Sequence, residues 1–208
     1  MKILTTAADA PDEAVIAEAA DVLRQGGVVA YPTDTLYGLA VDPRRDDAVE
    51  RLFTLKGRDA GSAMPLIASS LEQAQMAAVA GAAERRLART FWPGPLTIVM
   101  PPQPGLSPAV LGGGPTVGIR VPSHAVARAL AAAFGFCITA TSANRSGESP
   151  AATGGDVAAA LASAVDLLLD SGPVAGGPPS TIVEITDAGP RLLRPGAVAW
   201  DRVLKSLE

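Results

Sequence analysis

Several residue types on which enzymes and small folds depend are almost missing from this sequence. Its 208 residues include one cysteine, Cys137, and one histidine, His124. A single cysteine excludes a disulfide within the chain and leaves no cysteine spacing for a zinc site. We expect Cys137, in an apolar stretch, to be a buried and inert thiol. Any Ser-His-Asp or Cys-His catalytic group would need His124, which we expect instead to cap a helix or to lie on the surface.

Positive charge and long apolar runs are also scarce. Lys and Arg together number 17 against 21 Asp and Glu, which gives a formal net charge of −4. Broad binding to nucleic acid depends on clustered Lys and Arg, so any contact with RNA should be local. No run of about 18 apolar residues is present, so we expect no membrane span. The N-terminal segment soon becomes acidic, unlike a signal peptide, and we expect a cytoplasmic protein.

The sequence does contain enough apolar material for a full core. Hydrophobic residues make up 48% of the chain, and the length favours a single domain over residues 1–208. Helical and strand patterns alternate, which predicts an α/β fold with mixed strand order and flanking helices. The expected strands cover residues 28–31, 65–68, 96–100, 117–121, 136–140, 167–169, 180–185 and 191–193.

Two short polar clusters lie where apolar elements end, and they are the first candidates for a binding site. One contains Lys56 and Arg58, and the other contains Ser142 and Asn144. Two cations with two small hydrogen-bonding groups suit a nucleotide phosphate. Lys56 follows Val49 by seven residues on the apolar helix face and should point inward. The alternative is that these cations only complement the dipole at a helix C-terminus.

A nucleotide site in this chain would differ from a P-loop. The glycine run at residues 112–114 is followed by Pro115, without the Lys and the Ser or Thr that a P-loop needs. The small polar residues after Thr141 allow close backbone approach to an anion, as phosphate-binding loops do. They are equally compatible with an ordinary loop.

Further polar side chains follow or interrupt apolar strands. Thr33, Asp34 and Thr35 come directly after an expected strand, and strand ends are where open α/β sheets hold ligands. They also fit a simple turn. Arg120 alternates with Ile119 and its apolar neighbours, so it should face the opposite side and could clamp a carboxylate. A solvent-exposed arginine would show the same alternation.

Taken in order, these segments resemble the YrdC-like family of L-threonylcarbamoyladenylate synthases in its single-domain form. The segments that carry the resemblance are residues 31–39, 56–58, 65–66, 92–97, 118–122, 141–147, 180–183 and 193–196. The resemblance implies a twisted mixed sheet with flanking helices and a large concave cavity. It also implies that L-threonine, bicarbonate and ATP, with Mg²⁺, give threonylcarbamoyl-AMP and pyrophosphate. The product would serve the threonylcarbamoyladenosine modification of tRNA next to the anticodon, through a downstream transferase complex and with weak tRNA contact at most.

The resemblance also assigns residues to roles. Catalysis would depend on Lys56, Arg58, Ser142 and Asn144. ATP would contact Lys56, Arg58, Thr116, Ser142 and Arg194. Threonine would be held by Thr33 or Thr35 with Arg120, Ala140 and Ser180, and Arg120 would take its carboxylate. No residue is expected to form a dedicated metal site.

Two departures from the family pattern accompany this resemblance. Residues 59–64 form a longer segment before Pro65 than the family usually has, and Ala68 and its neighbours replace a histidine often found there. Two other functions fit part of the pattern. A carbamoyl-adenylate-forming domain would share the phosphate residues but would not need Arg120 for an amino acid. A non-enzymatic RNA-binding module is disfavoured by the acidic charge balance.

Overall fold

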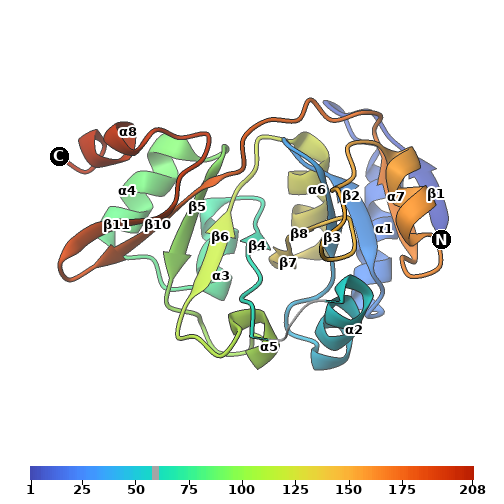
Figure 1. Cartoon of the computed structure of the whole chain (residues 1–208), viewed down its shortest axis with the longest axis horizontal. Coiled ribbons are helices and arrows are strands. Elements are labelled where there is room, and N and C mark those ends of the chain that lie inside the picture. Colours follow the sequence, from blue (N-terminus) through green and yellow to red (C-terminus); the bar gives the residue numbers. More distant parts are fainter. Residues whose placement is uncertain (58–60) are drawn as a thin grey trace.

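The chain folds around two β-sheets, as the computed structural model in Figure 1 shows. The structure describes residues 1–57 and 61–208, so Arg58 lies outside the described residues. Within that part of the chain, the predicted α/β class with mixed strands and flanking helices is confirmed. The strands divide between two sheets, a division that the sequence pattern did not indicate.

The first sheet has five strands in the order β1-β9-β2-β3-β8. Their bounds are β1 Lys2–Thr5, β9 Leu167–Asp170, β2 Val29–Pro32, β3 Tyr37–Ala40 and β8 Thr141–Ser142. Strands β1, β9 and β2 run parallel, whereas β3 is antiparallel to both β2 and β8. Every residue of β2 and β3 is buried. Of the residues between these two strands, Thr33 is also buried, whereas Asp34, Thr35 and Leu36 are partly exposed.

The second sheet has six strands in the order β11-β10-β5-β6-β4-β7. Their bounds are β11 Gly189–Arg194, β10 Thr181–Thr186, β5 Leu96–Met100, β6 Val117–Arg120, β4 Leu66–Ile67 and β7 Ile138–Thr139. The chain passes from β7 in this sheet to β8 in the first sheet through Ala140. The N–H of Ala140 donates to the carbonyl of Pro65 at 2.8 Å. Ala140 therefore lies where the two sheets meet.

Helices cover the outer faces, and one of them contacts both sheets. The helices are α1 Glu13–Arg24, α2 Asp46–Lys56, α3 Leu71–Ala77, α4 Ala82–Phe91, α5 Pro108–Leu111, α6 Ala125–Phe134, α7 Gly154–Leu161 and α8 Trp200–Lys205. Helix α6 packs against α1, β2 and β4 and occupies the middle of the molecule in Figure 1. Helices α1 and α7 pack on β9, and α4 packs on β5. None of the helices in the described part of the chain is long and apolar enough to span a membrane.

Local sequence explains why the first helix forms where it does. The Asp12 carboxylate accepts hydrogen bonds from the N–H groups of Ala14 and Val15 at 2.8 and 3.2 Å. These bonds satisfy donors that a helix start otherwise leaves unpaired. The buried residues of the helix are Ile16, Ala19, Ala20 and Leu23. Their spacing of three and four residues puts them on one face, which packs against the core.

Candidate active site

A cavity of about 420 Å³ lies between the two sheets, and residues from both sheets line it. All the residues predicted to hold threonine are in this lining, namely Thr33, Thr35, Arg120, Ala140 and Ser180. Ser142 and Arg194, predicted to contact ATP, also line it. The fold therefore brings together side chains from β6, β8, β11 and the loops that follow β2 and precede β10.

The Lys56 side chain joins the two polar clusters that the sequence places 86 residues apart. Its Nζ donates to the Ser142 carbonyl at 2.6 Å, to Asn144 Oδ1 at 2.9 Å and to Ser142 Oγ at 3.3 Å. Lys56 is only 4% exposed, as its position on the apolar helix face predicted. A buried ammonium is tolerated only when it is hydrogen-bonded in this way. The alternative role, complementing the helix dipole from the surface, is therefore wrong for Lys56.

Backbone geometry holds the two clusters against each other. Helix α2 is capped by Gly57, whose φ of 59° is in the left-handed region that glycine adopts easily. The carbonyl of Lys56 accepts the N–H of Ser146 at 2.8 Å. The Asn144 amide donates to the carbonyls of Arg145 and Glu148 at 2.9 and 2.7 Å. Its Oδ1 thereby faces Lys56, and it also accepts the Ser142 hydroxyl at 2.5 Å.

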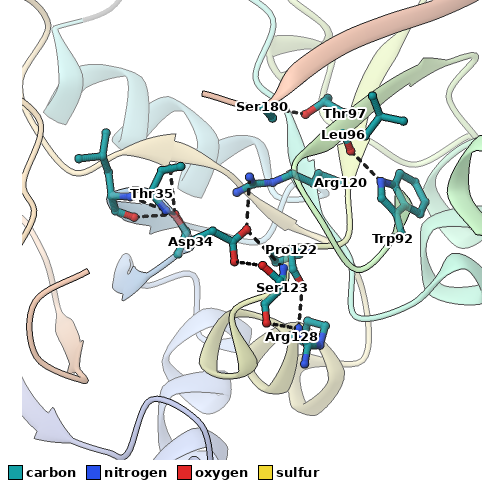
Figure 2. Close-up of polar contacts among 12 residues, drawn as sticks. Asp34, Thr35, Trp92, Leu96, Thr97, Arg120, Pro122, Ser123, Arg128 and Ser180 are labelled. Carbon is teal, nitrogen blue, oxygen red and sulfur yellow. Dashed lines mark hydrogen bonds and ion pairs between the residues drawn. The ribbon is translucent and has the colours of Figure 1, made fainter. Parts of the chain in front are cut away.

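Arg120 enters the cavity from β6. The burial of Val117 and Ile119 against the partial exposure of Gly118 and Arg120 confirms the predicted alternation. The Arg120 side chain is 11% exposed, and its Nη1 lies 3.5 Å from Asp34 Oδ2 (Figure 2). Arg120 is thus a largely buried cation aimed at the cavity.

Arg194 brings a second guanidinium to the cavity, at its exposed side. Its Nη2 donates to the carbonyl and the hydroxyl of Ser180 at 2.8 and 3.0 Å. Partial desolvation and the positive charge of Arg120 lower the pKa of Arg194, although a guanidinium remains charged at neutral pH. The two guanidinium groups repel each other because both are positively charged. An anionic ligand in the cavity would stabilise both charges.

Thr97 belongs to the site, although the sequence reasoning gave it no role. It lines the cavity, is 3% exposed, and its hydroxyl lies 2.8 Å from that of Ser180 (Figure 2). The Ser180 hydroxyl is therefore held between Thr97 and Arg194. The sequence does hold a signal for Thr97, since it is a hydroxyl residue within an apolar strand. A buried hydroxyl requires a hydrogen-bond partner, which points to a polar neighbour.

The turn after β2 is ordered by Thr33. Its hydroxyl donates to the Leu36 carbonyl at 2.6 Å and accepts the N–H groups of Thr35 and Leu36, both at 3.3 Å. The structure therefore supports the turn interpretation for Thr33. Thr35, less buried than Thr33, is the better placed of the two to contact a ligand.

Two aromatic residues of the cavity wall are held as neutral phenols. Burial raises the pKa of Tyr31, whose hydroxyl donates to the Thr139 carbonyl at 3.2 Å. Burial, with a smaller effect from Asp170, raises the pKa of Tyr37 to about 12. The Tyr37 hydroxyl donates to the Gly172 carbonyl at 2.7 Å. Neither residue can serve as a base near neutral pH.

The remaining predicted residues lie apart from this cavity or outside the described chain. Thr116 directly precedes β6 and is not among the described residues that line the cavity, so its contact with ATP stays a prediction, as does the role of Arg58. Cys137 is fully buried, as expected, and burial raises the pKa of its thiol to about 12; that the thiol is inert stays a prediction. His124 is the N-cap residue of α6, but its side chain makes no capping hydrogen bond. Burial lowers the pKa of His124, and the nearby Asp34 partly offsets this effect.

The fold and the site define an α/β protein with a cation-rich cavity between two sheets. Residues 21–196 match the Sua5/YciO/YrdC family model, whose description is "Telomere recombination". A threonylcarbamoyl-AMP synthase of Chromohalobacter salexigens is 40% identical over 173 residues, which cover 82% of this chain and 92% of that protein. The chain therefore belongs to the Sua5/YciO/YrdC family, and the family predicted from the sequence motifs is confirmed.

Two longer relatives extend the comparison over most of the chain. A threonylcarbamoyl-AMP synthase of Bacillus subtilis is 38% identical over 192 residues, which cover 90% of this chain and 55% of that protein. A crystal structure of Pyrococcus abyssi Sua5 complexed with L-threonine superposes with a TM-score of 0.92 at 34% identity, covering 99% of this chain and 61% of that chain. The chain thus spans less than two thirds of the length of these two relatives.

Proposed function

We propose that this protein forms threonylcarbamoyl-AMP and pyrophosphate from L-threonine, bicarbonate and ATP. The observation that carries the proposal is the cavity between the sheets, where Arg120 and Arg194 face the same space and Ser142 connects it to Lys56. The proposal also draws on relatives named threonylcarbamoyl-AMP synthase and on a relative crystallised with L-threonine. We propose that residues 1–208 perform this reaction as a single domain.

In the proposed complex, threonine binds at the Arg120 side of the cavity. The guanidinium of Arg120 would take its carboxylate in two parallel hydrogen bonds. Thr35, Ser180 and the backbone at Ala140 would contact the rest of the amino acid. The cavity wall next to these groups includes Leu36 and Ile67. An apolar wall of this kind favours threonine over serine by roughly 10- to 200-fold per methyl group.

ATP would place its phosphates between Lys56, Ser142, Asn144 and Arg194, together with Arg58. The amine of threonine and bicarbonate first form a carbamate with loss of water. A carbamate oxygen then attacks the α-phosphorus, the bond from that phosphorus to the bridging oxygen breaks, and pyrophosphate leaves with the electron pair. Such transfers depend on positioning and on neutralising charge, so a site without a histidine base is sufficient.

Mg²⁺ would enter with ATP as part of the substrate complex. The residues described by the structure contain no group of three His, Cys, Asp or Glu side chains that could hold a metal ion. Mg²⁺ commonly relies on substrate phosphates and water for most of its ligands. The phosphates of ATP and water would therefore supply most of the ligands of this ion.

The proposal also covers the fate of the product, contact with tRNA and the location of the protein. The product carries an activated acyl group, so a transferase complex that modifies tRNA next to the anticodon would consume it. The formal charge of −4 argues that tRNA contact is weak. A cytoplasmic location would fit a chain whose single cysteine is a buried free thiol.

The test is pyrophosphate release from ATP, measured with threonine, serine or no amino acid, each with and without bicarbonate. The proposal requires release that depends on both threonine and bicarbonate, with serine slower. Release that needs no amino acid but requires an added carbamoyl donor such as carbamoyl phosphate would replace it with carbamoyl adenylation. If no release occurs under any condition, a steep salt dependence of RNA binding would instead indicate the binding module.

A further inference from the structure

The carboxylate of Asp34 lies beside the Arg120 guanidinium. Asp34 is 16% exposed, and its Oδ2 approaches Arg120 Nη1 at 3.5 Å. Asp34 does not line the cavity between the sheets. It lines a separate hollow of about 470 Å³ on the far side of the ion pair. We infer that Asp34 is a positioning residue, which fixes the Arg120 guanidinium for the carboxylate of an amino acid substrate; this inference rests on the function proposed above.

Ser123 fixes the orientation of the Asp34 carboxylate. The Ser123 hydroxyl donates to Asp34 Oδ1 at 2.7 Å, and the Ser123 N–H donates to Oδ2 at 3.3 Å. Figure 2 shows the carboxylate between Ser123 on one side and Arg120 on the other. Both oxygens are thereby engaged, and the one nearer to Arg120 is oriented by a backbone group.

Both ends of this contact are themselves held in place. Arg128 donates to the carbonyls of Pro122 and Ser123 at 2.8 and 2.5 Å, which ties the segment after Arg120 to helix α6 (Figure 2). On the other side, the Thr33 hydroxyl closes the turn that carries Asp34. The ion pair therefore connects a hydrogen-bonded turn to the end of β6, and the segment after β6 is bonded to α6.

The arrangement leaves one side of the guanidinium for a ligand. Among the residues that the structure describes, the Arg120 guanidinium pairs with Asp34 and makes no other side-chain hydrogen bond or ion pair. A long flexible side chain loses conformational entropy when a ligand fixes it, which weakens binding of that ligand. Because Asp34 already restrains the Arg120 side chain in the free protein, less of this entropy is lost when the ligand binds. The negative charge of Asp34 also lies close to Arg120, whose positive charge lowers the pKa of Arg194.

The test compares steady-state kinetics of Asp34→Asn, Asp34→Ala and the wild type. The KM for threonine should rise about tenfold in Asp34→Ala, the effect of one side chain that is no longer held in place. The kcat and the KM for ATP should change less than about twofold. Asp34→Asn, which can still donate or accept one neutral hydrogen bond, should recover part of the loss. A rise in the KM for ATP that equals the rise for threonine would indicate a merely structural role and overturn the inference.

L-Threonine amide provides a readout that general instability would not change. It lacks the charged carboxylate, so Asp34→Ala should narrow the preference of the enzyme for threonine over the amide by about tenfold, equal to about 1.4 kcal/mol. In an Arg120→Ala background, the same Asp34 substitution should change the KM for threonine little further. The reason is that Asp34 acts on threonine through Arg120, which this variant lacks. Two results would refute positioning through Arg120. One is an unchanged preference for threonine over the amide, and the other is fully additive effects of the Asp34 and Arg120 substitutions.

Asp42→Asn is the matched control. Asp42 is also buried and also pairs with an arginine, Arg44, at 2.9 Å, but neither residue lines the cavity. Its substitution should leave both KM values unchanged. If the Asp34 variants do not fold, Ser123→Ala should raise the KM for threonine by a few fold in the same direction, and no change would count against the inference. If the wild-type protein shows no threonine-dependent release of pyrophosphate, the proposed function itself is wrong.

Discussion

Replacing Lys56 by methionine gives the most direct test of the site. Methionine keeps most of the buried volume of the side chain and removes its charge and its three hydrogen bonds to Ser142 and Asn144. The loss of one preorganised donor to developing charge typically lowers kcat by about 10²- to 10³-fold, or about 2.7–4 kcal/mol. We expect at least this loss for Lys56→Met, because the ammonium also orients two other proposed phosphate contacts.

The same structure predicts a smaller effect on stability. The Ser142 carbonyl would lose the donor at 2.6 Å, whereas Asn144 Oδ1 would keep the Ser142 hydroxyl at 2.5 Å. One unsatisfied buried acceptor costs about 1–3 kcal/mol. In a chain of this size each kcal/mol lowers the Tm by about 2–4 °C. We therefore expect a Tm lowered by roughly 2–12 °C and a variant that stays folded at 25 °C.

The assay is single-turnover pyrophosphate release at saturating threonine, bicarbonate and ATP, together with a thermal melt. Lys205→Met is the matched control, because Lys205 is an exposed lysine at the end of α8 and its loss should change neither quantity. A Lys56→Met variant that is folded and retains more than about a tenth of the wild-type rate would refute the assignment of Lys56 to transition-state stabilisation.

Three further predictions concern Arg120, Cys137 and His124. Arg120→Ala should raise the KM for threonine by about 100-fold, the loss of a charge-assisted bidentate contact worth about 3 kcal/mol, while the KM for ATP stays within about twofold; equal rises in titrations of both substrates would contradict the assignment. Cys137, with a pKa raised to about 12 by burial, should resist alkylation at pH 8 in the native state and react only on unfolding, as mass spectrometry of the intact protein would show. Burial lowers the pKa of His124 in the folded state, although Asp34 and Asp9 act against this and Arg128 acts with it. Its contribution to stability should therefore be complete above the unfolded pKa of about 6.5 and decline as the pH falls through the folded value; a His124→Gln variant should lose less Tm than the wild type between pH 7.5 and 5.5, and equal losses would refute this.

The parts of the site that follow from local periodicity could be predicted from the sequence. Seven-residue spacing on a helix face predicted that Lys56 points inward, and it is 4% exposed. Two-residue alternation predicted that Arg120 faces away from Val117 and Ile119, and the burial pattern of β6 agrees. Both rules depend only on neighbours in the chain.

Contacts between distant segments could not be predicted in this way. The short strands β3 and β8 were not expected, because strands of two to four residues show little periodic pattern in the sequence. The pairing of Asp34 with Arg120 joins the turn after β2 to the end of β6, two segments that no local pattern relates. The Thr33 hydroxyl closes its own turn, a contact that the sequence could not distinguish from the threonine contact assigned to Thr33 or Thr35. Burial and pairing of polar groups depend on the tertiary fold, which decides among several locally acceptable roles.

The meeting of the two sheets at Ala140 has a consequence for how the protein should respond to its substrates. The cavity walls belong to different sheets, and the direct chain connection through β7 and β8 is short. A ligand that contacts Arg120 on one wall and Ser142 on the other would act as a cross-link between them. Ligand present at about 100 times its Kd should add about 2.7 kcal/mol of stability. Because both walls would share this gain, amide hydrogen exchange should slow together in β3 and β6, elements that are far apart in sequence.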